Sequence, residues 1–252
     1  MPIVTLTTDF GTRDGFVGAL KGVVWSICPE AQIADITHEI APQNIREGAM
    51  ALWRAYPFFP GGTVHVAVVD PGVGTTRRPI AARLGEHVFV GPDNGLFTPI
   101  YEDASRLGRG VEIVHLTNPR YFLPKVSRTF HGRDIFSPVA AHLARGVPFA
   151  DLGPPVTDPV RIPIFRAERT AGGWKAHISV VDIFGNLTTG GGRGPRERAA
   201  SFSPARPRGP GAGRLLRPAE TWRLDCAGGQ REQHRDCCRQ WFRRPAAGRP
   251  GG

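Results

Sequence analysis

Residues 63–74 read TVHVAVVDPGVG, and this segment indicates the class of fold more directly than any other part of the chain. The segment alternates at first and then becomes continuously apolar up to Val69, as a strand buried on both faces of a parallel sheet does. Asp70 and a glycine-rich turn follow at once. Because ligands of open α/β sheets bind beyond the carboxyl ends of the strands, Asp70 is a candidate functional residue.

The surrounding sequence alternates strand and helix signals, which predicts an α/β domain with a mostly parallel sheet flanked by helices. Apolar runs predict strands at residues 3–6, 32–36, 63–69, 80–84, 87–90, 111–116 and 177–183. Apolar residues at helical spacing predict helices at 16–27, 45–55 and 135–143. We expect an N-terminal α/β domain at 1–165, followed at 166–190 by the start of a small β domain that is truncated or damaged.

The net charge of +10 is concentrated at the end of the chain. Residues 1–190 carry 18 Lys and Arg against 17 Asp and Glu, whereas residues 191–252 carry 14 against 5. The last 62 residues also contain no Val, Ile, Lys, Met, Tyr or Asn and show no apolar periodicity. One interpretation is a basic, low-order tail that coats nucleic acid, for which a steeply salt-dependent affinity for DNA would be expected.

A second interpretation is that residues 191–252 are an out-of-frame translation that begins near Thr189 or Gly190. Residues 235–244 read RDCCRQWFRR. Moving the reading frame of their permitted codons one base downstream allows Glu-Ile-Ala-Val-Val-Asn-Gly-Ser-Ala-Ala. That is an ordinary strand-and-turn sequence, so the basic composition then reflects the shifted frame and carries no nucleic-acid function.

Several classes of protein are disfavoured by the composition. No run of about 18 apolar residues occurs, and the start MPIVTLTTDF lacks the features of a signal peptide, so we expect a cytoplasmic protein without membrane partners. Cys28 is the only cysteine before the tail, and no pair of cysteines has the spacing of a zinc site. We therefore expect neither a metal nor a disulfide.

Two loops near the start of the chain carry candidate residues. Asp9 follows the first strand, and its carboxylate could accept hydrogen bonds from a vicinal diol such as a ribose. Asp14 precedes the first helix, where binding a ligand and capping the helix are both open. In the loop after Asp70, Arg77 and Arg78 add two guanidinium groups, for which a solvated ion pair is the simpler explanation.

Three further segments of the chain have the composition of functional loops. The turn-forming segment 91–95, GPDNG, follows the strand at 87–90. His131 lies in FHGRD, just before a helix, and could serve as a general base or as a hydrogen-bond donor. Asp182, Phe184 and Asn186 end the last clear strand and together could hold an amino group and stack against a base.

In their order along the chain, these motifs resemble the signature of the S-adenosylmethionine (SAM) hydroxide adenosyltransferases, which are relatives of the SAM-dependent fluorinase and chlorinase. The resemblance runs from Ile3 to about Thr189 through TTDFGTRDGFVGALKG, VVDPGVGTTRR, GPDNGLFTP, FHGRDIFSP and DIFGN. It implies that the N-terminal domain is catalytic, and that SAM is cleaved to adenosine and methionine as a substrate, without a further cofactor.

The resemblance also implies roles for individual residues. Asp70, Arg77 and His131 match the family's water-activating triad, and the halogenases carry a tyrosine where Asp70 stands, which favours hydrolysis over halogenation. Asp9 would hold the ribose hydroxyls, with Asp14 nearby. The segment at 182–186 would complete the substrate site, with Phe184 and Asn186 at the adenine and Asp182 at the methionine ammonium.

The family forms its site between neighbouring subunits of a homotrimer and closes it with a C-terminal Glu-Ile-Ala motif. That motif is absent from this chain but available in the shifted frame. The alternatives are therefore an active SAM hydrolase, a SAM- or adenosine-binding remnant without activity, and, less favoured, a halogenase.

Overall fold

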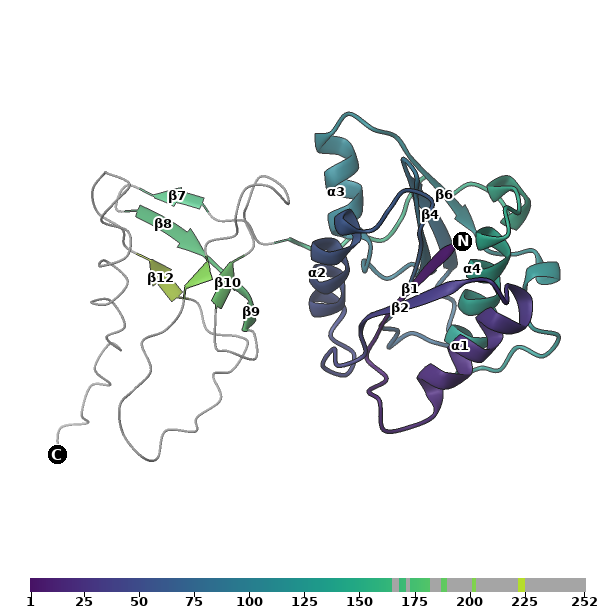
Figure 1. Ribbon diagram of the computed structural model, residues 1–252. Helices are drawn as coiled ribbons and strands as arrows, with labels where there is room; N and C mark the ends of the chain where they lie inside the picture. The colour runs from purple at the N-terminus through teal and green to yellow at the C-terminus, as the bar shows by residue number, and fades with distance from the viewer. Residues whose placement is uncertain (165–167, 171–172, 182–186, 190–200, 203–221, 225–252) are drawn as a thin grey trace. The chain divides into compact units, whose positions relative to one another are not determined.

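The computed structural model describes residues 1–164, 168–170, 173–181, 187–189, 201–202 and 222–224 (Figure 1). The chain divides into two compact units, residues 1–164 and residues 165–252. The first unit contains all the described helices and the larger sheet. No helix in the described part of the chain is long and apolar enough to span a bilayer.

A six-stranded mixed sheet forms the centre of the first unit, in the order β2-β1-β3-β5-β4-β6. The strands β1 (Ile3–Thr8), β2 (Gln32–Thr37), β3 (Val64–Val68) and β5 (His87–Pro92) pair in parallel. The strand β4 (Pro79–Leu84) runs antiparallel between β5 and β6 (Val111–His115). The mostly parallel sheet predicted from the sequence is confirmed, with β4 as the one reversed strand among those of this unit.

Two layers of helices cover the sheet (Figure 1). α1 (Phe16–Ile27) and α4 (Ser137–Ala144) pack on one face, and α2 (Ile45–Ala55) and α3 (Thr98–Arg106) on the other. Alternate residues of β3 divide between the two cores: Val66 and Val68 face α1 and α4, whereas Ala67 faces α2 and α3. By the same alternation Asp70 follows β3 on the side of α4.

Two helical segments differ from the sequence prediction. α3 was not predicted, because it has Pro99 in its first turn and directly follows a turn-forming segment. The helix expected at 135–143 begins earlier, with a π-helical turn at Gly132–Phe136 that leads into α4. Such turns often occur at functional sites, and this one directly follows His131. Short 3₁₀ turns lie at Tyr56–Phe58, Pro119–Tyr121 and Phe149–Leu152.

The second unit contributes two small antiparallel sheets. One has the order β11-β10-β9, formed by β9 (Ile178–Val181), β10 (Leu187–Thr189) and β11 (Ser201–Phe202). The other has the order β12-β8-β7, formed by β7 (Glu168–Thr170), β8 (Gly173–Ala176) and β12 (Trp222–Leu224). The strand predicted at 177–183 is present as β9. Within 191–252 only β11 and β12 are described, so the low-order tail stays a prediction.

Candidate active site

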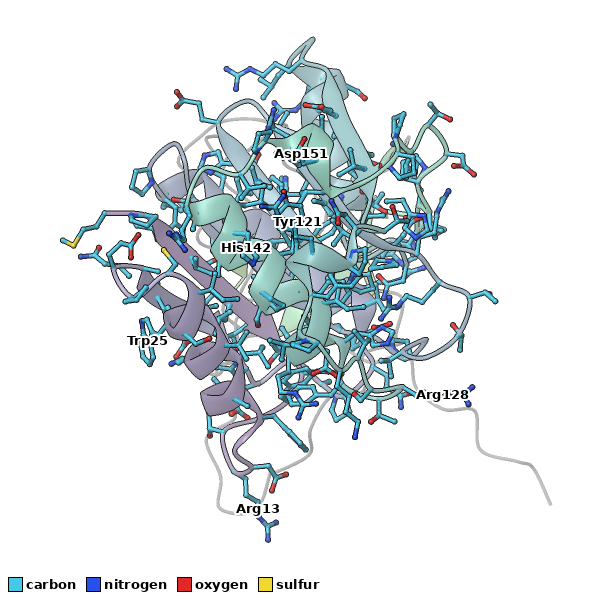
Figure 2. The ribbon with its side chains drawn as sticks, turned by 90° about the vertical axis from the view of Figure 1, so that its right-hand side faces the viewer. Arg13, Trp25, Tyr121, Arg128, His142 and Asp151 are labelled. Carbon is cyan, nitrogen blue, oxygen red and sulfur yellow. The ribbon has the colours of Figure 1, made fainter. Side chains whose placement is uncertain are left out.

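The side chains of Asp70, Arg77 and His131 come together beyond the carboxyl end of β3. Asp70 lies two residues after β3, Arg77 lies two residues before β4, and His131 directly precedes the π-helical turn. In Figure 2, Arg13 of the loop after β1 and Arg128 of the loop before His131 both lie in the lower part of the view, away from Asp151. The hydrogen bonds from Arg77 to Asp70 and to His131 show that loops distant in sequence meet beyond the strand ends.

Arg77 joins the other two residues by hydrogen bonds. Its Nε donates to Asp70 Oδ1 and Oδ2 at 3.0 and 2.9 Å, and its Nη2 donates to Oδ2 at 2.5 Å. The same Nη2 donates to Nδ1 of His131 at 2.8 Å, across 54 residues of sequence. The side chains of Arg77 and Asp70 are only 9% and 5% exposed, so solvent screens this pair far less than a surface pair. The solvated ion pair considered from the sequence is wrong.

This contact fixes the tautomer of His131. A guanidinium can only donate, so Nδ1 of His131 must accept, and the single proton of the neutral ring lies on Nε2. Burial of the imidazole, together with the charge on Arg77, lowers the pKa of His131 below the ordinary histidine value. The ring is therefore neutral at pH 7 and presents an N–H donor on the side away from Arg77.

Arg77 keeps one further donor group. Within the described part of the chain, its Nη1 is buried and has no hydrogen-bond partner, while its guanidinium carbon lies 5.3 Å from the centroid of the Phe136 ring. A buried donor without a partner costs about 1–3 kcal/mol unless a ligand or water satisfies it. Arg77 thus combines fixed geometry with unused capacity to donate.

Asp134 holds the loop that carries His131. Its buried carboxylate accepts from the backbone of Ser127 at 2.8 Å and from Nε of Arg133 at 2.6 Å. Burial alone would raise the pKa of Asp134, but these hydrogen bonds outweigh it and lower the pKa. Phe130 in turn donates its backbone N–H to the Ser127 hydroxyl at 3.0 Å. The loop that carries His131 is therefore held by hydrogen bonds at Ser127 and at Asp134.

An aromatic group borders the same site. Phe10, Phe16 and Phe130 meet edge to face, with centroid distances between 5.2 and 6.1 Å. A Cβ added at Gly132 would lie 3.4 Å from Phe10, which is ordinary van der Waals contact. Phe16, the first residue of α1, is 46% exposed. Its ring extends this aromatic group and leaves the α1 core to Val17, Leu20 and Val24.

Asp9 lies at the edge of the site and has one described partner. Its Oδ2 accepts from the backbone N–H of Gln43 at 2.8 Å, and Gln43 adopts a left-handed conformation with φ of +65°. A residue other than glycine rarely adopts this conformation, so the contact helps to fix the loop that faces Asp9. Each carboxylate oxygen has two lone pairs, which leaves capacity for further donors.

Asp14 does not cap the helix that follows it. α1 begins at Phe16 with Gly15 as its N-cap, and no side chain makes a capping hydrogen bond. Asp14 is exposed, so the capping role left open from the sequence is wrong. Asp182, Phe184 and Asn186 lie outside the described residues. Among the residues that are described, no group of three or more His, Cys, Asp or Glu side chains is arranged to hold a metal ion.

Comparison with known proteins identifies the family of this chain. The family model described as the SAM hydroxide adenosyltransferase N-terminal domain matches residues 4–153. This chain belongs to the SAM hydroxide adenosyltransferase family. The matched residues contain β1 to α4, and with them Asp9, Asp70, Arg77 and His131.

Individual relatives are similar over most of the length of this chain. The (R)-S-adenosyl-L-methionine hydrolase of Salinispora arenicola is 46% identical over 188 residues, which cover 74% of this chain and 70% of that protein. A crystal structure of a conserved protein from Thermotoga maritima superposes with a TM-score of 0.69 at 38% identity, covering 75% of this chain and 70% of that one. A fluorinase from an Actinoplanes species is more distant, at 28% identity over 225 residues.

The partners of the second arginine, Arg78, could not be read from the sequence. Arg78 points away from the triad and bonds Asp93 with Nε at 2.8 Å. It also reaches Asp158 with Nη1 at 2.7 Å. The sequence GPDNG at 91–95 is typical of a turn. Nothing in it indicates that this loop contacts the residues on either side of the segment that carries Asp70 and Arg77.

Proposed function

We propose that this chain hydrolyses SAM to adenosine and L-methionine. The observation that carries the proposal is the hydrogen-bonded series Asp70, Arg77 and His131, which leaves the buried Arg77 Nη1 free to donate. Relatives that are 42–47% identical are named SAM hydrolases. The family model covers residues 4–153, which include the three residues.

The reaction is a displacement at the ribose C5′ of SAM. A bond forms between the nucleophile's oxygen and C5′ while the bond between C5′ and sulfur breaks, and its electron pair neutralises the sulfonium. Methionine leaves uncharged, so the leaving group needs no acid catalyst. When water is the nucleophile, one proton passes to solvent. SAM is the substrate, and the proposed chemistry requires no further cofactor.

The arrangement of the three side chains favours hydroxide over water. Arg77 occupies the lone pair of His131 Nδ1, so the neutral imidazole cannot remove a proton, and Arg77 also engages both oxygens of Asp70. The groups that remain are N–H donors in a largely buried site, and such donors stabilise an anion. Free water has a pKa of about 15.7, and donors aimed at its oxygen favour the ionised form. Arg77 thus acts as the donor through Nη1, while Asp70 and His131 Nδ1 hold its guanidinium in place.

The structure describes some of the residues that we propose bind the substrate, and others lie outside the described residues. In the proposal Asp9 accepts the ribose hydroxyls through the capacity that Gln43 leaves unused, and Asp14 lies in the same loop. The edge-to-face group of Phe10, Phe16 and Phe130 offers an apolar wall beside the triad. The family resemblance adds Asp182, Phe184 and Asn186, with the acid at the methionine ammonium and the other two at the adenine.

The setting of the enzyme is part of the same proposal. The family resemblance supports a cytoplasmic homotrimer with no membrane partner and no specific nucleic-acid partner. The codon argument supports an out-of-frame end after Thr189 or Gly190, in which case the closing motif of the site is missing from this chain. Sequencing the gene across these two codons tests the frame directly.

The function is tested by turnover of SAM with the full chain and with a frame-restored version. Chromatography would quantify adenosine and methionine, and calorimetry would measure adenosine binding. Asp70→Ala is expected to reduce turnover by at least about a hundredfold while adenosine affinity stays within about twofold, because Asp70 orients the nucleophile's partners and does not hold the nucleoside. Full activity of Asp70→Ala would remove the triad from the proposal. If both the full chain and the frame-restored version bind adenosine without turnover of SAM, the result would support the alternative of a binding remnant without activity.

A further inference from the structure

The loop at 91–95, GPDNG, touches both ends of the segment that carries the triad residues Asp70 and Arg77. Asn94 donates from Nδ2 to the carbonyl of Val69 at 2.8 Å, and its Oδ1 accepts from the backbone N–H of Leu96 at 3.2 Å. Val69 is fully buried and directly precedes Asp70. The Asn94 amide, which belongs to a different loop, therefore holds the backbone directly before Asp70.

Asp93 holds the other end of the segment. Its Oδ2 accepts from Nε of Arg78 at 2.8 Å and lies 2.6 Å from Nη2, and its backbone N–H donates to the Arg78 carbonyl at 2.9 Å. The Asp93 side chain is 2% exposed and that of Arg78 is 28% exposed. A carboxylate buried to this degree is stable only when it is paired, so the contact fixes Arg78 firmly.

This pairing decides which arginine reaches the triad. Arg77 and Arg78 are adjacent in the chain just before β4, yet their side chains have different partners. Arg77 meets Asp70 and Arg78 meets Asp93, so each guanidinium has a carboxylate of its own. If Asp93 did not hold Arg78, both cations could compete for Asp70.

The same loop also holds the segment that leaves the first unit. Asp93 Oδ1 accepts from the backbone of Val160 at 2.8 Å, and Arg78 Nη2 donates to the carbonyl of Asp158 at 2.8 Å. Gly95 has a φ of +96°, and the side chain of Ile162 occupies the place that a Cβ there would need. Residues 158–162 thus rest on the loop that also braces the triad segment.

We propose that Asn94 and Asp93 are positioning residues for the Asp70–Arg77–His131 triad, and that Asp93 with Arg78 ties residues 158–162 to the triad segment. Only the expected change in kcat rests on the proposed function. The geometric consequence is that loss of either side chain lets Arg77 move away from His131, whatever the activity of the chain.

The test for Asn94 uses a matched control that the chain provides. Asn118 makes the same two kinds of hydrogen bond. Its Nδ2 donates to the Asp151 carbonyl at 2.8 Å, and its Oδ1 accepts from the backbone N–H of Arg120 at 3.1 Å. Neither bond reaches a loop that carries a triad residue. Asn94→Ala and Asn118→Ala would be compared in the full chain. The main readout is the titration of the His131 ring by NMR, with melting temperature recorded for both variants.

We expect the pKa of His131 to rise by about half a unit or more in Asn94→Ala, because the Arg77 charge that helps to lower it has moved away. Asn118→Ala should leave that titration unchanged at a similar loss of melting temperature. Where turnover is measurable, kcat of Asn94→Ala should fall about tenfold with KM within about twofold. An unchanged His131 titration in folded Asn94→Ala would overturn the assignment. If Asn94→Ala does not fold, Asn94→Ser is measured in the same way.

The contact with residues 158–162 is tested by hydrogen exchange. Arg78→Met should speed exchange of the Val160 amide by about tenfold or more, since Asp93 loses the partner that fixes its orientation. The Val156 amide, which bonds the Ile113 carbonyl at 2.8 Å, is the internal control and should keep its rate. Equal rates for Val160 in both proteins would refute the tie. If the chain shows no turnover but the His131 titration and the Val160 exchange rate change as expected, the proposed function is wrong and this inference stands.

Discussion

Gly74 lies directly against the backbone carbonyl of Arg128, so the loop that carries Asp70 and Arg77 packs on the loop that carries His131. Gly74 has a φ of +74°, and a Cβ at this position would overlap the carbonyl oxygen. Glycine is required here for two independent reasons, namely the left-handed backbone and the close approach. The triad is assembled by this contact as much as by its own hydrogen bonds.

Gly74→Ala should therefore separate the two loops. We expect an unfolding free energy lower by about 2 kcal/mol or more and turnover reduced by at least about tenfold, since misplacement of catalytic groups by a fraction of an ångström is costly. Gly62→Ala is the control, because Gly62 has a φ of +84° but open space around it. That variant should show the backbone cost of about 1 kcal/mol alone. Equal stability losses in the two variants would contradict a packing role for Gly74.

Arg77→Lys should remove the geometry that one guanidinium supplies. Lysine keeps the charge but cannot present a planar fork to Asp70 while also donating to Nδ1 of His131. We expect kcat to fall by about a hundredfold or more. Nitrogen chemical shifts of the imidazole should show the proton on Nε2 in the wild type and a mixture of tautomers in the variant. Wild-type kcat in Arg77→Lys would mean that charge alone suffices.

The pH dependence of turnover should follow the protonation of His131. Burial and the Arg77 charge lower the pKa of this ring, so its neutral form persists below the ordinary value of 6.5. Protonation removes the Nδ1 lone pair that accepts from Arg77, so turnover is expected to show an acid limb at the titration of this ring, separate from any rise with hydroxide concentration at higher pH. Removing the nearby cation in Arg77→Met should move the acid limb to higher pH. A limb that stays in place would show that another group controls it.

His65 should make the protein less stable in acid, independently of the site. It is fully buried in β3, bonds the Thr5 hydroxyl at 2.8 Å, and burial lowers its pKa to about 3 from an ordinary 6.5. The unfolded chain therefore takes up a proton between these values and the folded chain does not. The resulting stability is present above pH 6.5 and is lost as pH falls, by about 2 kcal/mol near pH 5.

The measurement is urea unfolding near pH 7 and near pH 5. His65→Gln cannot titrate, so the difference between the two pH values should shrink by most of that amount even if the variant is less stable overall. His87, which lies 3.2 Å from His65 and is partly exposed, provides the comparison variant His87→Gln. A slope unchanged by His65→Gln would show that other groups cause the acid sensitivity.

Local patterns predicted most of the first unit. The apolar run before Asp70 became β3, and the helical spacing at 45–55 became α2 with the same bounds. These features are readable because side-chain periodicity depends only on neighbours along the chain. α3 was missed for a related reason, since Pro99 resembles a turn signal even though proline is favoured in the first turn of a helix.

The triad residues could be named from their motifs, but their bonding could not. Nothing in the sequence indicates that Arg77 would serve Asp70 and His131 while Arg78 turned to Asp93, or that Nδ1 of His131 would be the acceptor. Those choices depend on which loops meet beyond the sheet, and therefore on strand order, the glycine contact at Gly74 and the π-helical turn after His131. Contacts across 54 residues leave no local periodic trace, so packing of the folded chain decides them.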